Sequence, residues 1–207
     1  MKISEFKNLI KAMPVDYQAF DIKWRNWNKF ENKKINNIFN EQDIIISRKD
    51  IFNENDIETL ILKTLMWGYP TKGRGKNIEN FIGDKHFIVF CDALKRYKKN
   101  NISIEIIKKD MKIITSGLGT STMTKFLYFL NVKVNNIQTL ILDQKIIDTL
   151  NANRFDEFKD LKDIKYETVL NKYEDYLKIM NDVSVNINCK PDELEMFLFT
   201  FGKILKI

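Results

Sequence analysis

The chain has 207 residues, of which 44% are hydrophobic and 30% charged, and its formal net charge at pH 7 is +6. This balance excludes a disordered chain and predicts a globular protein with one substantial core or two small lobes. A basic charge is compatible with a polyanionic partner such as nucleic acid, although charge alone does not require one.

The cysteine and histidine content argues against a metal centre or a disulfide scaffold. Cys91 and Cys189 are the only cysteines, and His86 is the only histidine, which is too few for a closed zinc site of the Cys/His type. We expect buried thiols in a reduced, cytoplasmic protein. The N-terminal residues lack the apolar run of a secretory signal, and no apolar stretch is long enough to cross a membrane.

Apolar spacing predicts helices in the first part of the chain. Residues Ile3 to Ile10 recur at helical spacing, and Pro14 ends that helix. A second, short helical segment is predicted over 17–39, where aromatic residues recur in the manner of a core face. The apolar run Ile44 to Ile46 is too short to assign.

The next predicted helix ends in a loop that combines aromatic residues with cations. Asn55 or Asp56 can cap this helix, and the loop WGYPTKGRGKN spans Trp67 to Asn77. Its glycines and proline interrupt regular structure. Such a loop suits contact with a phosphate backbone or a base, whereas a charged surface loop with two anchoring aromatics is the alternative. The candidates are Trp67 and Tyr69 for a base pocket and Lys72, Arg74 and Lys76 for the DNA backbone.

Further helices are predicted on both sides of the central stretch. They cover 87–94 and 104–114 before it, and 166–177 after it. Pro191 is placed at the first turn of a final helix. No stretch alternates in the manner of a strand, so we predict a mainly α fold with few or no strands.

The central stretch from Ile113 to Ile147 begins with a Gly-Leu-Gly turn between two predicted helices. Glycines permit a tight reversal and close approach of another backbone, and the free N–H groups that open the next helix can receive a phosphate oxygen. These parts predict a helix-hairpin-helix grip on a DNA backbone, and a plain helix–helix turn is the alternative. The candidate DNA-binding residues in the turn are Gly117, Leu118, Gly119, Thr120 and Ser121.

Lys125 lies in the helix that follows the turn, at the border of its apolar stripe. It is spaced three and four residues from Thr122 and Phe129. Partial desolvation there would lower the pKa of the amine and free its lone pair, as a Schiff-base nucleophile requires. The alternative is a lysine whose stem covers Phe129 while its charge stays in water.

Asp143 directly follows the apolar run Leu140 to Leu142 and is placed to cap the next helix. A cap would fix the carboxylate while its charge faces the hairpin helix. The structural and the catalytic role of Asp143 are therefore compatible.

The motifs GLG, TKFLYF and ILDQKI resemble the hairpin, the catalytic lysine and the catalytic aspartate of the helix-hairpin-helix DNA glycosylase superfamily. Within it, the chain is most similar to the bacterial 8-oxoguanine DNA glycosylase-like family. The WGYP…GRG loop and the PDELEMFLF segment resemble that family too, so the resemblance covers roughly Leu60 to Phe199. It implies one two-lobed helical unit over 1–207, with the hairpin and catalytic core at about 101–150.

The resemblance also implies an activity and its residues. The protein would be a monomeric DNA glycosylase without a cofactor that flips a damaged or modified base out of double-stranded DNA and excises it. Schiff-base lyase activity is an extension of this chemistry. Lys125 would attack the sugar C1′, and Asp143 would assist departure of the base. Because the C-terminal helix lines the base pocket in this superfamily, Phe197 and Phe201 join the pocket candidates. Two biological roles are compatible with this activity: repair of oxidised guanine, and defence against phage DNA that carries bulky modified bases.

Two departures from the family pattern leave alternatives. The residues Thr120 to Thr124 lengthen the hairpin and leave the register of Lys125 open. Lys145 stands where many relatives carry a histidine, so it contacts a phosphate or replaces Lys125 as the reactive amine. The rival class is a non-catalytic helix-hairpin-helix DNA-binding protein in which Lys125 and Asp143 are only structural.

Overall fold

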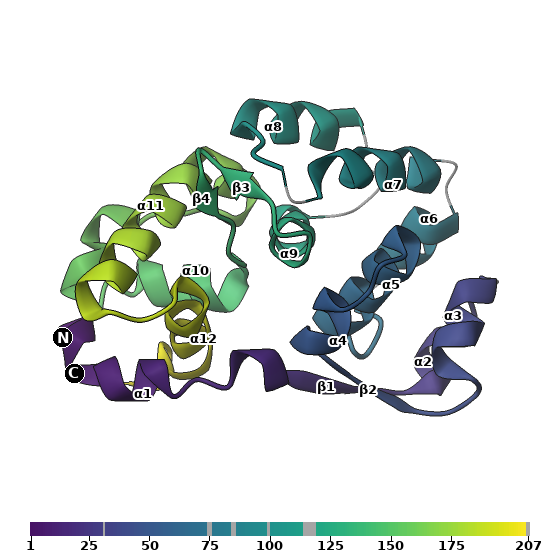
Figure 1. Cartoon of the computed structure of the whole chain (residues 1–207), viewed down its shortest axis with the longest axis horizontal. Helices are drawn as coiled ribbons and strands as arrows, with labels where there is room; N and C mark the ends of the chain where they lie inside the picture. Colours follow the sequence, from purple (N-terminus) through teal and green to yellow (C-terminus); the bar gives the residue numbers. More distant parts are fainter. Residues whose placement is uncertain (31, 74–75, 84–85, 99, 114–118, 206–207) are drawn as a thin grey trace.

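The computed structural model of the chain describes residues 1–30, 32–73, 76–83, 86–98, 100–113 and 119–205. The fold is mainly helical, which confirms the predicted class. In Figure 1 helix α9, Thr120–Phe129, lies between two groups of helices, with α2 to α7 on one side of it and α10 to α12 on the other.

The first group is built around α5. This group contains α2 (Trp24–Trp27), α3 (Lys33–Phe39), α4 (Arg48–Phe52), α5 (Ile57–Gly68), α6 (Asn77–Gly83) and α7 (His86–Tyr97). Helix α5 packs against α3, α4, α7 and α9. Asp56 caps it, since its carboxylate accepts the Thr59 N–H at 3.0 Å, which confirms one of the two predicted caps. Its last residues, Trp67 and Gly68, belong to the helix rather than to the predicted loop.

The second group brings the two ends of the chain together. It contains η1 (Ile3–Phe6), α1 (Lys7–Lys11), η2 (Val15–Tyr17), α10 (Gln144–Asn151), η3 (Asp156–Leu161), η4 (Tyr166–Thr168), α11 (Val169–Ile187) and α12 (Pro191–Phe201). Helix α1 packs on α12, and both termini lie on this side of the molecule (Figure 1). Pro191 occupies the first turn of α12, as predicted.

Two short antiparallel strand pairs complete the described structure. Strand β1, Ala19–Ile22, pairs with β2, Ile44–Ser47, so the helical prediction for 17–39 is wrong at its start. Strands β3, Lys133–Val134, and β4, Ile137–Gln138, form a hairpin. Asn135 and Asn136 make its turn with φ of 50° and 63°, the positive values that a tight hairpin turn needs and that asparagine tolerates.

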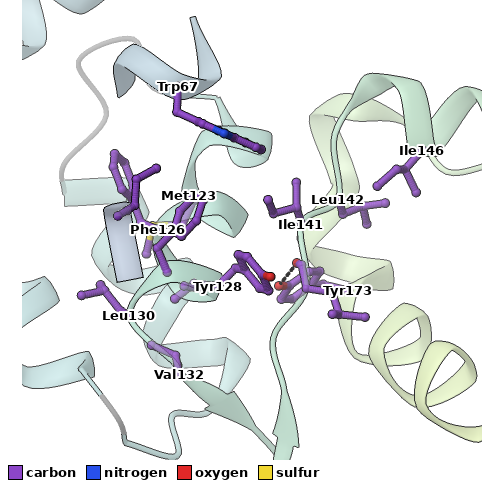
Figure 2. Close-up of a cluster of buried hydrophobic side chains, with 14 of the residues drawn as sticks. Trp67, Met123, Phe126, Tyr128, Leu130, Val132, Ile141, Leu142, Ile146 and Tyr173 are labelled. Atoms are coloured by element: carbon purple, nitrogen blue, oxygen red, sulfur yellow. Dashed lines mark hydrogen bonds between the residues drawn. The ribbon is translucent and has the colours of Figure 1, made fainter. Parts of the chain in front are cut away.

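An extended segment, 139–143, crosses from the β3–β4 hairpin to α10 and is fixed on both sides. The Tyr173 hydroxyl of α11 donates to the Leu140 carbonyl at 2.6 Å, and the Tyr176 hydroxyl donates to that of Ile141 at 2.9 Å. On the other side the Leu142 N–H donates to Thr124 Oγ1 of α9 at 3.1 Å. Figure 2 shows the Ile141 side chain directed toward the α9 side chains and the Leu142 side chain directed toward Ile146 of α10. The segment therefore delivers Asp143 to the side of α9.

The part of the chain that the structure describes offers neither a membrane span nor a metal centre. Its helices are too short or too polar to cross a bilayer. Its His, Cys, Asp and Glu side chains do not gather in groups that could hold a metal ion. Cys91 is buried and Cys189 partly buried, and both are free thiols.

Candidate active site

The candidate site begins at the N-terminus of α9. Gly119 precedes the helix in an extended conformation, and its carbonyl accepts the N–H groups of Thr122 and Met123 at 3.0 and 3.3 Å. Helix α8, Ile104–Ile113, precedes α9 in the chain. The predicted hairpin between these two helices stays a prediction. Gly117 and Leu118 lie outside the described residues.

Lys125 is more deeply buried than the sequence predicted. Every residue of α9 from Ser121 to Phe129 is buried, and Lys125 is only 6% exposed. The alternative of a lysine whose charge stays in water is therefore wrong for this structure. Its Nζ donates to the Ser121 hydroxyl at 3.0 Å, so its partner here is a neutral oxygen.

Burial changes the proton affinity of this amine. Desolvation lowers the pKa of Lys125, because removal from water disfavours the charged form. The negative charges of Asp143 and Glu195 oppose this effect in part, and the positive charge of Arg48 adds to it. The net direction is downward, toward a neutral amine with a free lone pair.

Asp143 caps α10, as predicted. Its Oδ1 accepts the N–H groups of Lys145 and Ile146 at 3.1 and 3.2 Å. Among the charged groups near Lys125, Asp143 has the largest effect on the pKa of its amine. The cap therefore holds a carboxylate in a fixed place within electrostatic range of the amine.

Comparison with protein families gives the site a context. Residues 13–199 match the model of a family described as "Putative 8-oxoguanine DNA glycosylase OGG-like protein". The chain belongs to this 8-oxoguanine DNA glycosylase-like family. The family description supports a DNA glycosylase with DNA as its substrate, and the predicted resemblance is confirmed. Comparisons with curated proteins and with solved structures gave no match.

In this glycosylase-like chain Trp67 belongs to the core. It is 4% exposed, and its Nε1 donates to the Gln18 carbonyl at 3.1 Å. Its ring packs against Phe20 and Phe129, with centroids 5.2 and 5.5 Å away. The prediction that Trp67 lines an open base pocket is therefore wrong for this structure, because neighbouring side chains already cover the ring.

Tyr69 stays available as a pocket residue and is tied to α9. Its ring is half-buried, and its hydroxyl shares a hydrogen bond of 2.6 Å with Thr122 Oγ1, one turn before Lys125. The structure brings Tyr69 beside α9, and its role in a base pocket stays a prediction.

The predicted phosphate contacts of the 67–77 loop differ from one another. Lys72 forms an ion pair with Glu79 and lies over the Phe30 ring, with Nζ 5.4 Å from its centroid. Its charge is therefore engaged within the protein, and its contact with DNA stays a prediction. Lys76 is exposed. Arg74 lies outside the described residues.

Two phenylalanines of the C-terminal helix were predicted to line a base pocket, and the structure places them differently. Phe197 is fully buried among Phe6 and Phe155, so the prediction that it lines a pocket is wrong for this structure. Phe201 is half-buried against Phe197. Phe199, which sequence reasoning missed, is half-buried and lies under Lys145, whose Nζ is 4.3 Å from the ring centroid.

A buried ion pair behind the site was also missed. Arg48, the first residue of α4, donates to both carboxylate oxygens of Glu195 in α12, at 3.0 and 3.2 Å. Both side chains are almost fully buried, and the guanidinium lies over the rings of Trp67 and Tyr128 at 5.3 and 5.1 Å. One feature of the sequence could have predicted this pair. Glu195 interrupts the apolar run LEMFLF, and a carboxylate buried at that position requires a partner.

Proposed function

We propose that the protein is a DNA N-glycosylase that excises a damaged or modified base, with Lys125 as the nucleophile and Asp143 as the stabilising carboxylate. One observation carries the proposal: a buried amine with a lowered pKa lies on the hairpin helix, within electrostatic range of a carboxylate fixed as a helix cap. Family membership supports the same reaction class.

The chemistry follows from these two groups. The neutral amine of Lys125 forms a bond to the sugar C1′ while the glycosidic bond breaks, and the bonding electrons leave with the base, which takes up a proton. The sugar becomes oxocarbenium-like in this step, and the negative charge of Asp143 stabilises it. Loss of a proton from the nitrogen and opening of the sugar ring then give a Schiff base, from which β-elimination of the 3′ phosphate cleaves the strand.

The target nucleotide has to leave the base stack, because C1′ is not accessible within a closed duplex. In the proposal the N–H groups at Gly119 and Ser121 receive a backbone phosphate. The exposed cations Lys76 and Lys145 add phosphate contacts. Tyr69 and Phe201 stay as candidates for the wall that the flipped base meets, and double-stranded DNA is the partner.

The reaction requires Lys125 to change its partner. In this structure the amine is bound to the Ser121 hydroxyl, close to the start of the helix where the phosphate is proposed to bind. A sugar that arrives on this side would replace the hydroxyl as the neighbour of the amine. The proposed chemistry takes place at C1′, so it is the same for oxidised guanine and for a bulky modified base, in a repair or a defence role.

Base release from a panel of duplexes, each with one defined modified base, tests the proposal. Lys125→Gln should lower excision at least about 10³-fold, since a nucleophile is removed. Asp143→Asn should lower it about 10²-fold or more through the lost charge, while asparagine still caps α10. Lys133→Gln, which removes an exposed lysine, is the matched control and should keep full activity.

Two outcomes would contradict the proposal in different ways. Salt-sensitive DNA binding without base release from any duplex would favour the non-catalytic binding protein. Equal excision by Lys125→Gln and by the unmodified protein would remove Lys125 from the mechanism and direct attention to Lys145.

A further inference from the structure

Three consecutive residues at the end of α5 contact one face of α9. The Trp67 ring packs against Phe129, Gly68 lies against Lys125, and Tyr69 bonds to Thr122. The α9 residues contacted are spaced by four and three positions, which places them on one face of the helix. We name the segment Trp67–Gly68–Tyr69 the α5 clamp.

The centre of the clamp leaves little room for a side chain. A Cβ atom built on Gly68 would stand 3.2 Å from Cδ of Lys125 and 3.5 Å from its Cε. The first distance is tighter than nine in ten contacts that real Cβ atoms make, so Lys125 would have to move by a few tenths of an ångström. The lysine stem therefore occupies the space that a side chain at position 68 would fill.

Backbone conformation does not explain this glycine. Gly68 is the last residue of α5 and has no positive φ that would require glycine. Glycine within a helix is less stable than alanine by about 1 kcal/mol in isolation. The contact with Lys125 is therefore the feature of this position that disfavours a side chain.

The flanking residues of the clamp hold the end of α5 in place against α9. Trp67 is held by its hydrogen bond to the Gln18 carbonyl and by its buried ring. Tyr69 is held by its hydroxyl bond to Thr122. Because both neighbours are fixed, an added methyl group at position 68 would displace the lysine stem rather than the α5 backbone.

We propose that Gly68 is a positioning residue for the Lys125 amine: its missing side chain leaves the channel in which the lysine stem lies. The channel sets where the amine stands relative to Ser121 and Asp143. The catalytic consequence rests on the proposed function, whereas the steric coupling between positions 68 and 125 does not. Reactive groups are sensitive to such shifts, since a displacement of about 1 Å can cost about 10²-fold in rate.

A double-mutant cycle on folding stability tests the steric coupling without DNA. Gly68→Ala should lower the urea midpoint in the unmodified protein and should not lower it in a Lys125→Ala background, where the stem is gone. Gly83→Ala is the matched control, since nothing lies within 4 Å of a Cβ at that position. Equal effects of Gly68→Ala in both backgrounds would overturn the proposal.

The position of the amine is tested by competitive acylation at a series of pH values, with each lysine quantified by mass spectrometry. In Gly68→Ala the labelling rate of Lys125 should change about tenfold and its pH midpoint should shift, while Lys133 is unchanged. In Gly83→Ala neither lysine should change. A Lys125 profile unaltered by Gly68→Ala would contradict the positioning role.

Borohydride trapping on duplex DNA with an abasic site connects the role to catalysis. Gly68→Ala should trap about tenfold more slowly than the unmodified protein, at equal DNA affinity. Absence of trapping by the unmodified protein would contradict the proposed Schiff-base chemistry, and the cycle and the labelling would still decide whether Gly68 positions Lys125. Trapping of Gly68→Ala at the unmodified rate would overturn the catalytic consequence alone.

Discussion

Among the residues that the structure describes, two cations, Arg48 and Lys125, are buried, and their surroundings differ. Arg48 is 1% exposed and meets a carboxylate with two hydrogen bonds, the Gln18 side-chain carbonyl with a third, and two aromatic faces. Lys125 is 6% exposed, and its amine donates to one hydroxyl. Arginine does not lose its proton in proteins, whereas lysine does so readily when it is buried.

This difference separates a structural charge from a chemically available one. The Arg48 charge is matched by Glu195, and the pair joins α4 to α12 across the molecule. The Lys125 charge is opposed by burial, and only the more distant Asp143 and Glu195 support it. Arg48 therefore has an architectural role, whereas burial lowers the pKa of Lys125.

The largest expected effect concerns the paired cation. Arg48→Met should lower the free energy of unfolding by about 3–5 kcal/mol, because Glu195 would remain buried without its partner. Urea unfolding followed by circular dichroism measures this change. The double variant Arg48→Met/Glu195→Leu should recover most of the loss. A single variant as stable as the unmodified protein would show that the pair has no structural role.

Substitution of Lys125, which has no ion-pair partner within the described part of the chain, should change the free energy of unfolding in the opposite direction. Lys125→Met removes a buried charge without leaving a close carboxylate behind, so it should stabilise the protein at neutral pH. The folded pKa of Lys125 lies below 10.5, so between that pKa and 10.5 the unfolded chain holds a proton that the folded one lacks. Stability of the unmodified protein should therefore rise with pH in this window, and the advantage of Lys125→Met should shrink.

Urea unfolding of both proteins at several pH values between 7 and 10 follows this difference. Only the unmodified protein has the rising contribution from Lys125, so subtraction of the two curves isolates it. A difference that stays constant across this range, or that grows with pH, contradicts a lowered pKa of Lys125.

The smallest effect concerns the neutral hydrogen bond beside Lys125. Tyr69→Phe removes the hydroxyl that bonds to Thr122 and should cost about 1 kcal/mol of unfolding free energy. Tyr17→Phe is the matched control, since Tyr17 is 74% exposed and should lose almost nothing. Equal values for the two variants would indicate that Tyr69 does not hold the α5 clamp against α9.

Local signals in the sequence predicted the parts of the site that depend on neighbours along the chain. Asp143 follows an apolar run and opens a polar helix, so its role as a cap could be predicted from those residues. Pro191 at the first turn of α12 is a signal of the same kind. The resemblance of the central motifs to the glycosylase family predicted the class of reaction, base excision.

Contacts between distant residues could not be predicted in the same way. Arg48 and Glu195 are separated by 147 positions, and only packing brings them together. The same applies to Lys125, whose helix is buried on every side by elements from both groups, and to β1, whose partner strand lies beyond two helices. The choice between Phe197 and Phe199 depends on how α12 is rotated against α10, which periodicity alone does not fix.

Identification of the trapped lysine tests the central claim most directly. Borohydride reduction of the protein on a duplex with an abasic site, followed by proteolysis and mass spectrometry, locates the residue joined to DNA. The account predicts that the adduct lies on Lys125 and that Lys125→Gln abolishes it. An adduct on Lys145, or an undiminished yield from Lys125→Gln, would contradict the claim that the buried, unpaired amine is the nucleophile.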